Sequence, residues 1–178
     1  PKTILGTGHN VQALLEPIKS DKMIIKLLEG THGQGVILTE SYRGTLTLIE
    51  ALQAAEVKFL IQEYVAESKG ADLRAIVVDG VVVAAMRRQG QDGEFRSNLH
   101  LGGSSENVKL SYKEEKIALQ AARALNLGVC GVDILQANNG PVILEVNSSP
   151  GLEGIETTTG KNISRSIISY IERSIQRK

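Results

Sequence analysis

The chain has 178 residues, enough for one domain or two small lobes. Its 20 basic and 20 acidic side chains cancel, which argues against an extended surface for binding polyanions. One cysteine, Cys130, excludes an internal disulfide, and no apolar run approaches the ~20 residues that span a bilayer. We therefore expect a cytoplasmic globular protein that contacts neither membranes nor nucleic acid directly.

The first part of the chain, residues 1–65, predicts a small α+β lobe. The expected elements are a short helix at 10–17, strands at 23–28, 36–39 and 59–65, and a helix that starts at Ser41. This last helix carries Leu46, Ile49 and Leu52 on one face, the pattern of a helix that packs against a sheet.

A glycine-containing loop, E-G-T-H-G-Q-G at 29–35, joins two of these strands. Its glycines, among them Gly33 and Gly35, would let backbone amides approach an anion, although a plain flexible hairpin tip explains them equally well. Lys26 lies inside the strand before the loop, and a lysine there needs an anionic partner, either a phosphate or a neighbouring acid. Together they favour a phosphate-binding segment.

The second part, residues 66–178, predicts a larger lobe. The expected elements are strands at 71–78 and 81–87, a loop at 89–105, a helix at 111–127, a hairpin that ends at 147, a loop at 148–161 and a helix at 163–176. Ser111 and Glu114 form a capping box, and Gly128 is expected to stop that helix. In the last helix, four residues are expected to form a core-facing stripe: Ile163, Ile167, Ile171 and Ile175. The hairpin connections favour antiparallel sheets.

Arginines gather around the loop at 89–105. Arg87 and Arg88 precede it and Arg96 lies within it, whereas the residues define no role for His100. A guanidinium suits bidentate contact with phosphate or carboxylate, so these side chains predict an anionic substrate or transition state. Ordinary surface charge is the alternative.

The hairpin near residue 140 is the most informative segment. Asn138-Asn139-Gly140 predicts a three-residue loop centred on Asn139, so that residue 137 faces residue 141. By the same count Asp133 faces Glu145.

Asn147 shares the sheet face of Glu145, because side chains alternate along a strand. Directly opposed acids destabilise a sheet, so Asp133, Glu145 and Asn147 need a reason to cluster. A divalent cation such as Mg²⁺ supplies one, since it prefers hard oxygen ligands. Solvated acids on an exposed face are the alternative.

Taken in order, these segments resemble the ATP-grasp superfamily. The most specific is the E-x-N-x-x-P-G pattern at 145–151. The stretches E-F-R-S-N-L-H-L-G-G at 94–103 and E-V-N-S-S-P-G-L-E-G-I-E at 145–156 are similar to the RimK type, whose members add glutamate to the C-terminus of a small-subunit ribosomal protein. The resemblance extends from Pro1 to about Arg173.

The resemblance implies an α+β ATP-grasp fold in which a small lobe, 1–65, and a large lobe, 66–178, have antiparallel sheets, flanking helices and a nucleotide in the cleft between them. It also implies a preceding pre-ATP-grasp domain, which this chain lacks, and allows a homo-oligomer in the full-length protein. The implied reaction joins a carboxylate to an amine through an acyl phosphate.

The resemblance also assigns roles to residues. ATP would be bound by Lys26, Gly33, Gly35, Glu63, Tyr64, Val65, Asp72, Arg96, Ser97 and Asn98. Two Mg²⁺ ions, or Mn²⁺, would be held by Asp133, Asn147 and a bridging Glu145. Lys26 and Arg96 would act in catalysis, and glutamate carboxylates would meet Arg74, Arg87 or Arg88.

Two alternatives remain open on the sequence alone. The same kind of ligase would act on another amino acid or on a peptide or cofactor acceptor. A nucleotide-binding regulatory module without turnover would retain the same residues.

Overall fold

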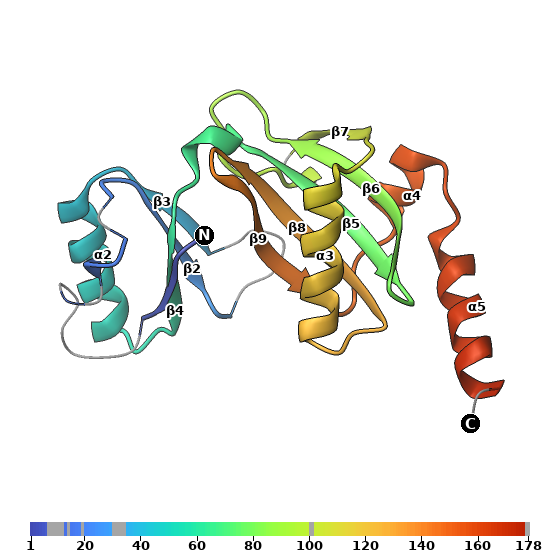
Figure 1. The fold of residues 1–178 in the computed structure, drawn as a ribbon. Helices are drawn as coiled ribbons and strands as arrows, with labels where there is room; N and C mark the ends of the chain where they lie inside the picture. Colours follow the sequence, from blue (N-terminus) through green and yellow to red (C-terminus); the bar gives the residue numbers. More distant parts are fainter. Residues whose placement is uncertain (7–12, 14, 19, 30–34, 100–101, 177–178) are drawn as a thin grey trace. The chain divides into compact units, whose positions relative to one another are not determined.

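The computed structural model describes residues 1–6, 13, 15–18, 20–29, 35–99 and 102–176 (Figure 1). The chain divides into two compact units, Pro1–Val65 and Ala66–Lys178. Each unit has its own antiparallel sheet and its own hydrophobic core. None of the helices in the described part is both long and apolar enough to traverse a bilayer.

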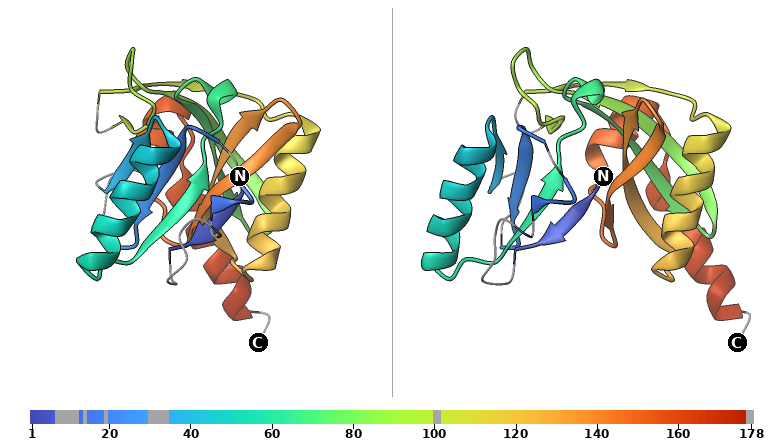
Figure 2. Two further views of the ribbon diagram at one scale, coloured as in Figure 1. Left: turned by 90° about the vertical axis from the view of Figure 1, so that its left-hand side faces the viewer. Right: turned by 60° about the vertical axis from the view of Figure 1, so that its left-hand side comes forward.

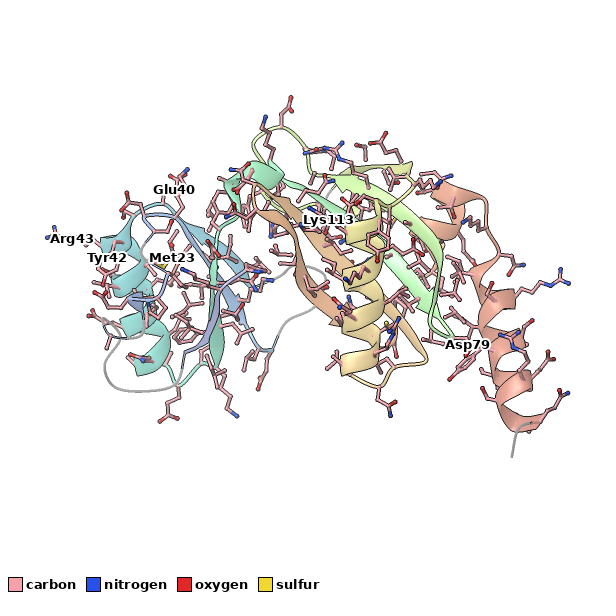
Figure 3. The ribbon with its side chains drawn as sticks, viewed as in Figure 1. Met23, Glu40, Tyr42, Arg43, Asp79 and Lys113 are labelled. Carbon is pink, nitrogen blue, oxygen red and sulfur yellow. The ribbon has the colours of Figure 1, made fainter. Side chains whose placement is uncertain are left out.

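The described part of the first unit contains a four-stranded antiparallel sheet with helix α2 (Tyr42–Ala54) packed against it. In spatial order the strands of this sheet are β1 (Thr3–Leu5), β4 (Phe59–Glu63), β2 (Met23–Leu27) and β3 (Val36–Thr39). Met23, labelled in Figure 3, is fully buried in the core together with Ile25, Ile61 and Ile49 of α2.

Local sequence explains the start of α2. The Ser41 side chain accepts a hydrogen bond from the Gly44 amide at 3.1 Å and so caps the helix. The predicted strands and this helix are confirmed, whereas β1 was not foreseen because it is only three residues long. Half of the helix expected at 10–17 lies outside the described residues, namely residues 10–12 and 14.

The second unit is a five-stranded antiparallel sheet with helices on both faces. The strands follow the spatial order β7 (Ser104–Asn107), β6 (Val81–Gln89), β5 (Ala71–Val78), β8 (Val129–Ala137) and β9 (Gly140–Asn147). The helices are η1 (Ala66–Ser68), α3 (Tyr112–Ala124), α4 (Glu153–Thr159) and α5 (Ile163–Gln176).

Strand alternation separates the two faces of this sheet. Leu73, Ala75 and Val77 of β5 pack with α3, whereas Ile76 and Val78 pack with residues of α4 and α5. Figure 1 and Figure 2 show α3 on one face and α4 on the other. The face opposite α3 is also the one on which Asp72 and Arg74 lie, since they alternate with the α3-facing residues.

The structure corrects two expectations about helix boundaries. The helix predicted at 111–127 begins with the expected capping box but ends at Ala124. Two residues later, Asn126 adopts the left-handed conformation with φ 53°. Gly128 has a different use: a Cβ there would lie 2.1 Å from the Tyr170 hydroxyl, so glycine permits α5 to approach. The expected loop at 148–161 contains α4, a helix too short for periodicity to indicate.

The isoleucine stripe of α5 is a third correction. Ile163 is buried and Ile167 packs against the core, but Ile171 and Ile175 are 44% and 68% exposed. Only the first half of the stripe therefore packs on the sheet of this unit.

Candidate active site

A row of charged side chains crosses the sheet of the second unit on the face opposite α3. Asp72 on β5 is in register with Arg88 on β6, and Arg74 on β5 is in register with Asp133 on β8. Glu145 on β9 is in register with Asp133. The sequence predicted the acids of this row, and the sheet order places arginines between them.

Four of these side chains form a buried ion-pair network. Arg74 donates from Nε to Asp133 Oδ1 at 2.7 Å and from Nη2 to Oδ2 at 2.6 Å. Arg88 Nη2 donates to Asp133 Oδ2 at 2.9 Å, and Arg88 also makes a bidentate contact with Asp72 through Nε and Nη2. The Asp133 side chain is 2% exposed, so its charge is neutralised by guanidinium groups instead of water.

The network shifts the pKa values of Asp72, Arg88 and Asp133. Burial alone would raise the pKa of Asp133, but hydrogen bonds from Arg74 and the charges of both arginines hold that pKa below its usual value. Burial alone would lower the pKa of Arg88, and Asp72 and Asp133 raise it instead. Burial and the charge of Asp133 raise the pKa of Asp72, against hydrogen bonds from Arg88 and Ser97. Since a guanidinium keeps its proton and donates two hydrogen bonds to Asp72, we take all four groups as ionised.

A β-bulge sets the register of the hairpin that carries Glu145. The loop has two residues, not the three expected, because Ala137 pairs with Gly140; the predicted pairing of residue 137 with 141 is wrong. A register shift between Asp133 and Ile134 then restores the expected pairing of Asp133 with Glu145. The predicted pairing of Asp133 with Glu145 is therefore correct, although the loop length from which it was counted is wrong.

Glu145 and Asn147 offer oxygens of the kind that Mg²⁺ binds. Glu145 is exposed, and Asn147 donates from Nδ2 to Glu145 Oε1 at 3.0 Å, an arrangement that leaves the Asn147 amide oxygen for another partner. The described residues contain no group of three or more His, Cys, Asp or Glu side chains placed to hold a metal ion. The candidate donors are two acids and one amide, a set whose chemistry fits a hard divalent cation.

Arg96 lies in the segment between β6 and β7 and is held by Glu94. The Arg96 backbone amide and Nε donate to Glu94 Oε1 at 3.0 and 2.9 Å, and Nη2 donates to Oε2 at 2.8 Å. Gly90 permits this packing, because a Cβ there would lie 2.4 Å from the Arg96 carbonyl oxygen. Ser97 hydrogen-bonds to Asp72 and so links this segment to the ion-pair network.

Asn98 follows Ser97 in the segment between β6 and β7, and the first unit contributes the other candidate residues. Lys26 on β2 lies on the face away from α2, because Met23 and Ile25 face the helix. Gly35, with φ 79°, ends the loop after β2, and its carbonyl accepts a hydrogen bond from Leu27 at 2.9 Å. The candidate Gly33 lies outside the described residues, as does His100, for which the sequence defined no role.

Glu63, Tyr64 and Val65 end the first unit. Glu63 Oε2 accepts a hydrogen bond from the Lys2 amide at 3.1 Å, Tyr64 is half-buried, and Val65 is buried.

Two ion pairs of the site, Arg74 with Asp133 and Arg96 with Glu94, were not predicted from the sequence. Arg74 is 59 residues from its partner Asp133, so no local pattern links them. Glu94, by contrast, stands two residues from Arg96, and that spacing is a signal that could have been used.

Comparison with known proteins identifies close sequence relatives. A family model described as the RimK-like ATP-grasp domain matches residues 1–171. A probable alpha-L-glutamate ligase of Halorhodospira halophila is 55% identical over 161 residues, or 90% of this chain and 53% of that protein. Another, from a Marinomonas species, is 50% identical over 177 residues, or 98% of this chain and 58% of that protein. The chain thus spans little more than half the length of these relatives.

Solved structures share the fold. The ATP-grasp ligase PsnB, complexed with a phosphomimetic variant of minimal precursor, Mg and ADP, matches with a TM-score of 0.70 and 23% identity, covering 100% of this chain and 53% of that one. The D-alanine–D-alanine ligase of Bacillus anthracis matches with a TM-score of 0.73 and 18% identity, covering 99% and 62%. The expected α+β fold with two antiparallel sheets is therefore confirmed. From the agreement of fold, motifs and family model, this chain belongs to the RimK-like ATP-grasp family.

Proposed function

We propose that this chain is the ATP-binding, amide-forming part of a carboxylate–amine ligase that adds glutamate to the C-terminus of an acceptor protein. One observation supports this most: a RimK-like sequence over residues 1–171 accompanies two acids and one amide, Asp133, Glu145 and Asn147, on one face of a sheet. The relatives named above are probable alpha-L-glutamate ligases, which supports glutamate as the amine.

ATP is the nucleotide in this proposal, and the residues that the family resemblance assigns to it would supply its contacts. Lys26 neutralises phosphate oxygens, and Gly33 and Gly35 allow the loop amides to approach them. The adenine and ribose meet the residues that end the first unit, namely Glu63, Tyr64 and Val65. Ser97 and Asn98 position phosphate groups.

The proposed cation site consists of Asp133, Glu145 and Asn147, which would hold two divalent cations, Mg²⁺ or Mn²⁺. When bound, the ions would neutralise the triphosphate and favour transfer of its terminal phosphoryl group. The protein's part is to fix the three oxygen donors: β8 and β9 hold them in register, and Asn147 orients Glu145 by its hydrogen bond. Asp133 is reached only after its contacts with arginine change.

The chemistry then proceeds on the substrates. The acceptor carboxylate takes the γ-phosphoryl group of ATP, which forms an acyl phosphate and releases ADP. The amine of glutamate attacks the acyl carbon, the carbon–nitrogen bond forms, and phosphate leaves as the amine loses a proton. Arg96, held in place by Glu94, stabilises the negative charge that develops on the acyl phosphate and the tetrahedral state.

The acceptor in this proposal is a ribosomal-protein tail, and the location is the cytoplasm. The tail follows from the resemblance to the RimK type. A cytoplasmic location agrees with the lone, buried Cys130, since a reducing compartment suits a free thiol.

The test is release of ADP by the chain joined to the N-terminal region of a full-length relative. A panel of amino acids is combined with peptides that carry different C-termini, including a ribosomal-protein tail. Glu145→Gln is expected to lower the rate by roughly 100-fold or more, since it removes a charged ligand. Glu115→Gln on the exposed side of α3 is the matched control and should leave the rate unchanged.

Each failure has a distinct meaning. Product from another amino acid or acceptor, with none from glutamate and the ribosomal tail, would contradict the substrate assignment and leave the ligase chemistry standing. Nucleotide binding without turnover on any pair would instead identify a regulatory module.

A further inference from the structure

The carboxylate of Asp133 is occupied by arginine in this structure. Three N–H groups donate to its two oxygens, two from Arg74 and one from Arg88, at 2.6 to 2.9 Å. A divalent cation that uses Asp133 must approach the same buried carboxylate, where two guanidinium groups repel it. The proposed metal site therefore requires one of the two arginines to change partner.

The two arginines differ in how firmly they are held. Arg88 bridges two carboxylates, Asp72 and Asp133, and its side chain is 9% exposed. Arg74 is 18% exposed, and within the described part of the chain both of its side-chain hydrogen bonds go to Asp133. Moving Arg88 would strand Asp72 as a buried charge, whereas moving Arg74 releases only the carboxylate that a cation would take over.

We propose that Arg74 is an exchangeable counter-ion for Asp133: it neutralises the carboxylate until a divalent cation arrives with a nucleotide, and then pairs with a phosphate oxygen of that nucleotide. The inference rests on the proposed function, because it takes Asp133 as a metal ligand. In this role Arg74 is a positioning residue that couples the binding of the cation to the binding of the triphosphate.

The net charge of the row explains why the divalent cation and the nucleotide would bind together. The row holds Arg74 and Arg88 against Asp72, Asp133 and Glu145, one net negative charge, so a free dication would leave an excess of positive charge. The displaced Arg74 would also have no anion to receive it. A triphosphate supplies both the negative charge and an oxygen pair that a guanidinium fork fits as well as it fits a carboxylate.

The first test measures Mn²⁺ binding by loss of the free-ion electron paramagnetic resonance signal, with and without a non-hydrolysable ATP analogue. Wild type is expected to bind free Mn²⁺ weakly and to gain affinity when the analogue is present. Arg74→Gln should bind free Mn²⁺ at least about tenfold more tightly than wild type, because the repelling charge is gone. Adding Glu145→Ala to Arg74→Gln should remove that gain.

Two control variants separate the role of charge from a general loss of structure. Arg74→Lys keeps the positive charge and should bind free Mn²⁺ as weakly as wild type. Arg173→Gln breaks another Arg–Asp pair of the same unit, with Asp79 at 3.1 Å, and should also behave as wild type. Asp79 lies at the tip of the β5–β6 hairpin, seven residues after Asp72 in the sequence (Figure 3).

A second measurement needs no destabilising variant. The ¹⁵N–¹H signal of Arg74 Nε in the wild-type chain, assigned by its loss in Arg74→Lys, reports the hydrogen bond to Asp133. Addition of the Mg²⁺–nucleotide analogue is expected to shift this signal and to leave that of Arg88 Nε in place. A signal of Arg74 that stays unchanged while the analogue binds would overturn the inference.

The outcomes distinguish this inference from the proposed function. If Arg74→Gln binds free Mn²⁺ no better than wild type, while nucleotide-dependent binding still requires Glu145, the counter-ion role fails and the metal site stands. If Mn²⁺ binding is indifferent to Glu145 under every condition, the metal site and the inference fail together.

Discussion

Asp133 and Glu145 face each other across neighbouring strands, yet their surroundings are opposite. Asp133 is buried and held by two guanidinium groups, whereas Glu145 is exposed and touches the Asn147 amide. The pair therefore combines a carboxylate that stabilises the protein with one that is available to a ligand.

This difference predicts unequal stability effects. Asp133→Asn leaves Arg74 and Arg88 facing an amide in a buried site, so the free energy of unfolding of residues 66–178 should fall by about 3–5 kcal/mol. Glu145→Gln keeps a side-chain oxygen that accepts the hydrogen bond from Asn147. This variant should therefore change the free energy of unfolding by less than about 0.5 kcal/mol. Urea denaturation of both variants gives the comparison; equal losses would contradict the ionised network.

At the scale of elements, α4 and α5 are connected by a cap that no local motif predicts. Glu156 of α4 accepts hydrogen bonds at Oε1 from the Ile163 and Ser164 amides of α5, at 2.7 and 2.9 Å. A carboxylate at this end of a helix satisfies amides that have no partner within the helix and complements the helix dipole. Together with Asn162, whose Oδ1 accepts a hydrogen bond from the Arg165 amide at 2.7 Å, it marks where α5 begins.

The cap makes the start of α5 sensitive to acid. The Ser164 amide and hydroxyl and the Ile163 amide hold the pKa of Glu156 below its ordinary value of 4.5. A lowered folded pKa means that the stabilisation is complete above 4.5 and is lost as the pH falls through the folded pKa. The amide proton shifts of Ile163 and Ser164 should therefore titrate with a midpoint below 4.5.

Two variants test the assignment to Glu156. Glu156→Gln should abolish the titration of the Ile163 and Ser164 amides, since it carries no ionisable group. Glu153→Gln, on the same helix and exposed, should leave it intact. A titration that survives in Glu156→Gln would assign the effect to another acid.

At the scale of the whole molecule, the two units have separate cores. The core of residues 1–65 contains Ile25, Ile49 and Ile61, while that of residues 66–178 is built around β5 and β8. No residue belongs to the core clusters of both units among those described. Separate cores predict that each unit can lose stability by itself.

Amide hydrogen exchange followed by mass spectrometry tests this independence. Ile61→Ala removes a fully buried side chain and should lower the stability of the first unit by about 2–5 kcal/mol. Exchange should then accelerate in residues 1–65 and stay unchanged in residues 66–178. Ile134→Ala in the second core should give the converse pattern, and acceleration in both units would show that they unfold together.

Much of the fold follows from local sequence. Apolar runs predicted the main strands, the Ser41 cap and the Ser111–Glu114 capping box predicted two helix starts, and hairpin dipeptides predicted antiparallel pairing. The short elements β1, β7 and α4 escaped prediction, because a few residues carry too little periodicity; β7 begins inside the loop expected at 89–105.

In the candidate site, too, some features follow from the sequence and others from the tertiary structure. The chain by itself determined which oxygen and nitrogen groups are present, since motifs such as E-x-N-x-x-P-G record residue types at fixed spacing. Only the tertiary structure decided which of them are neutralised: Asp133 receives Arg74 and Arg88 from strands 59 and 45 residues earlier. Sheet order, which depends on how whole strands pair, brings those charges within hydrogen-bonding distance, and no local pattern encodes it.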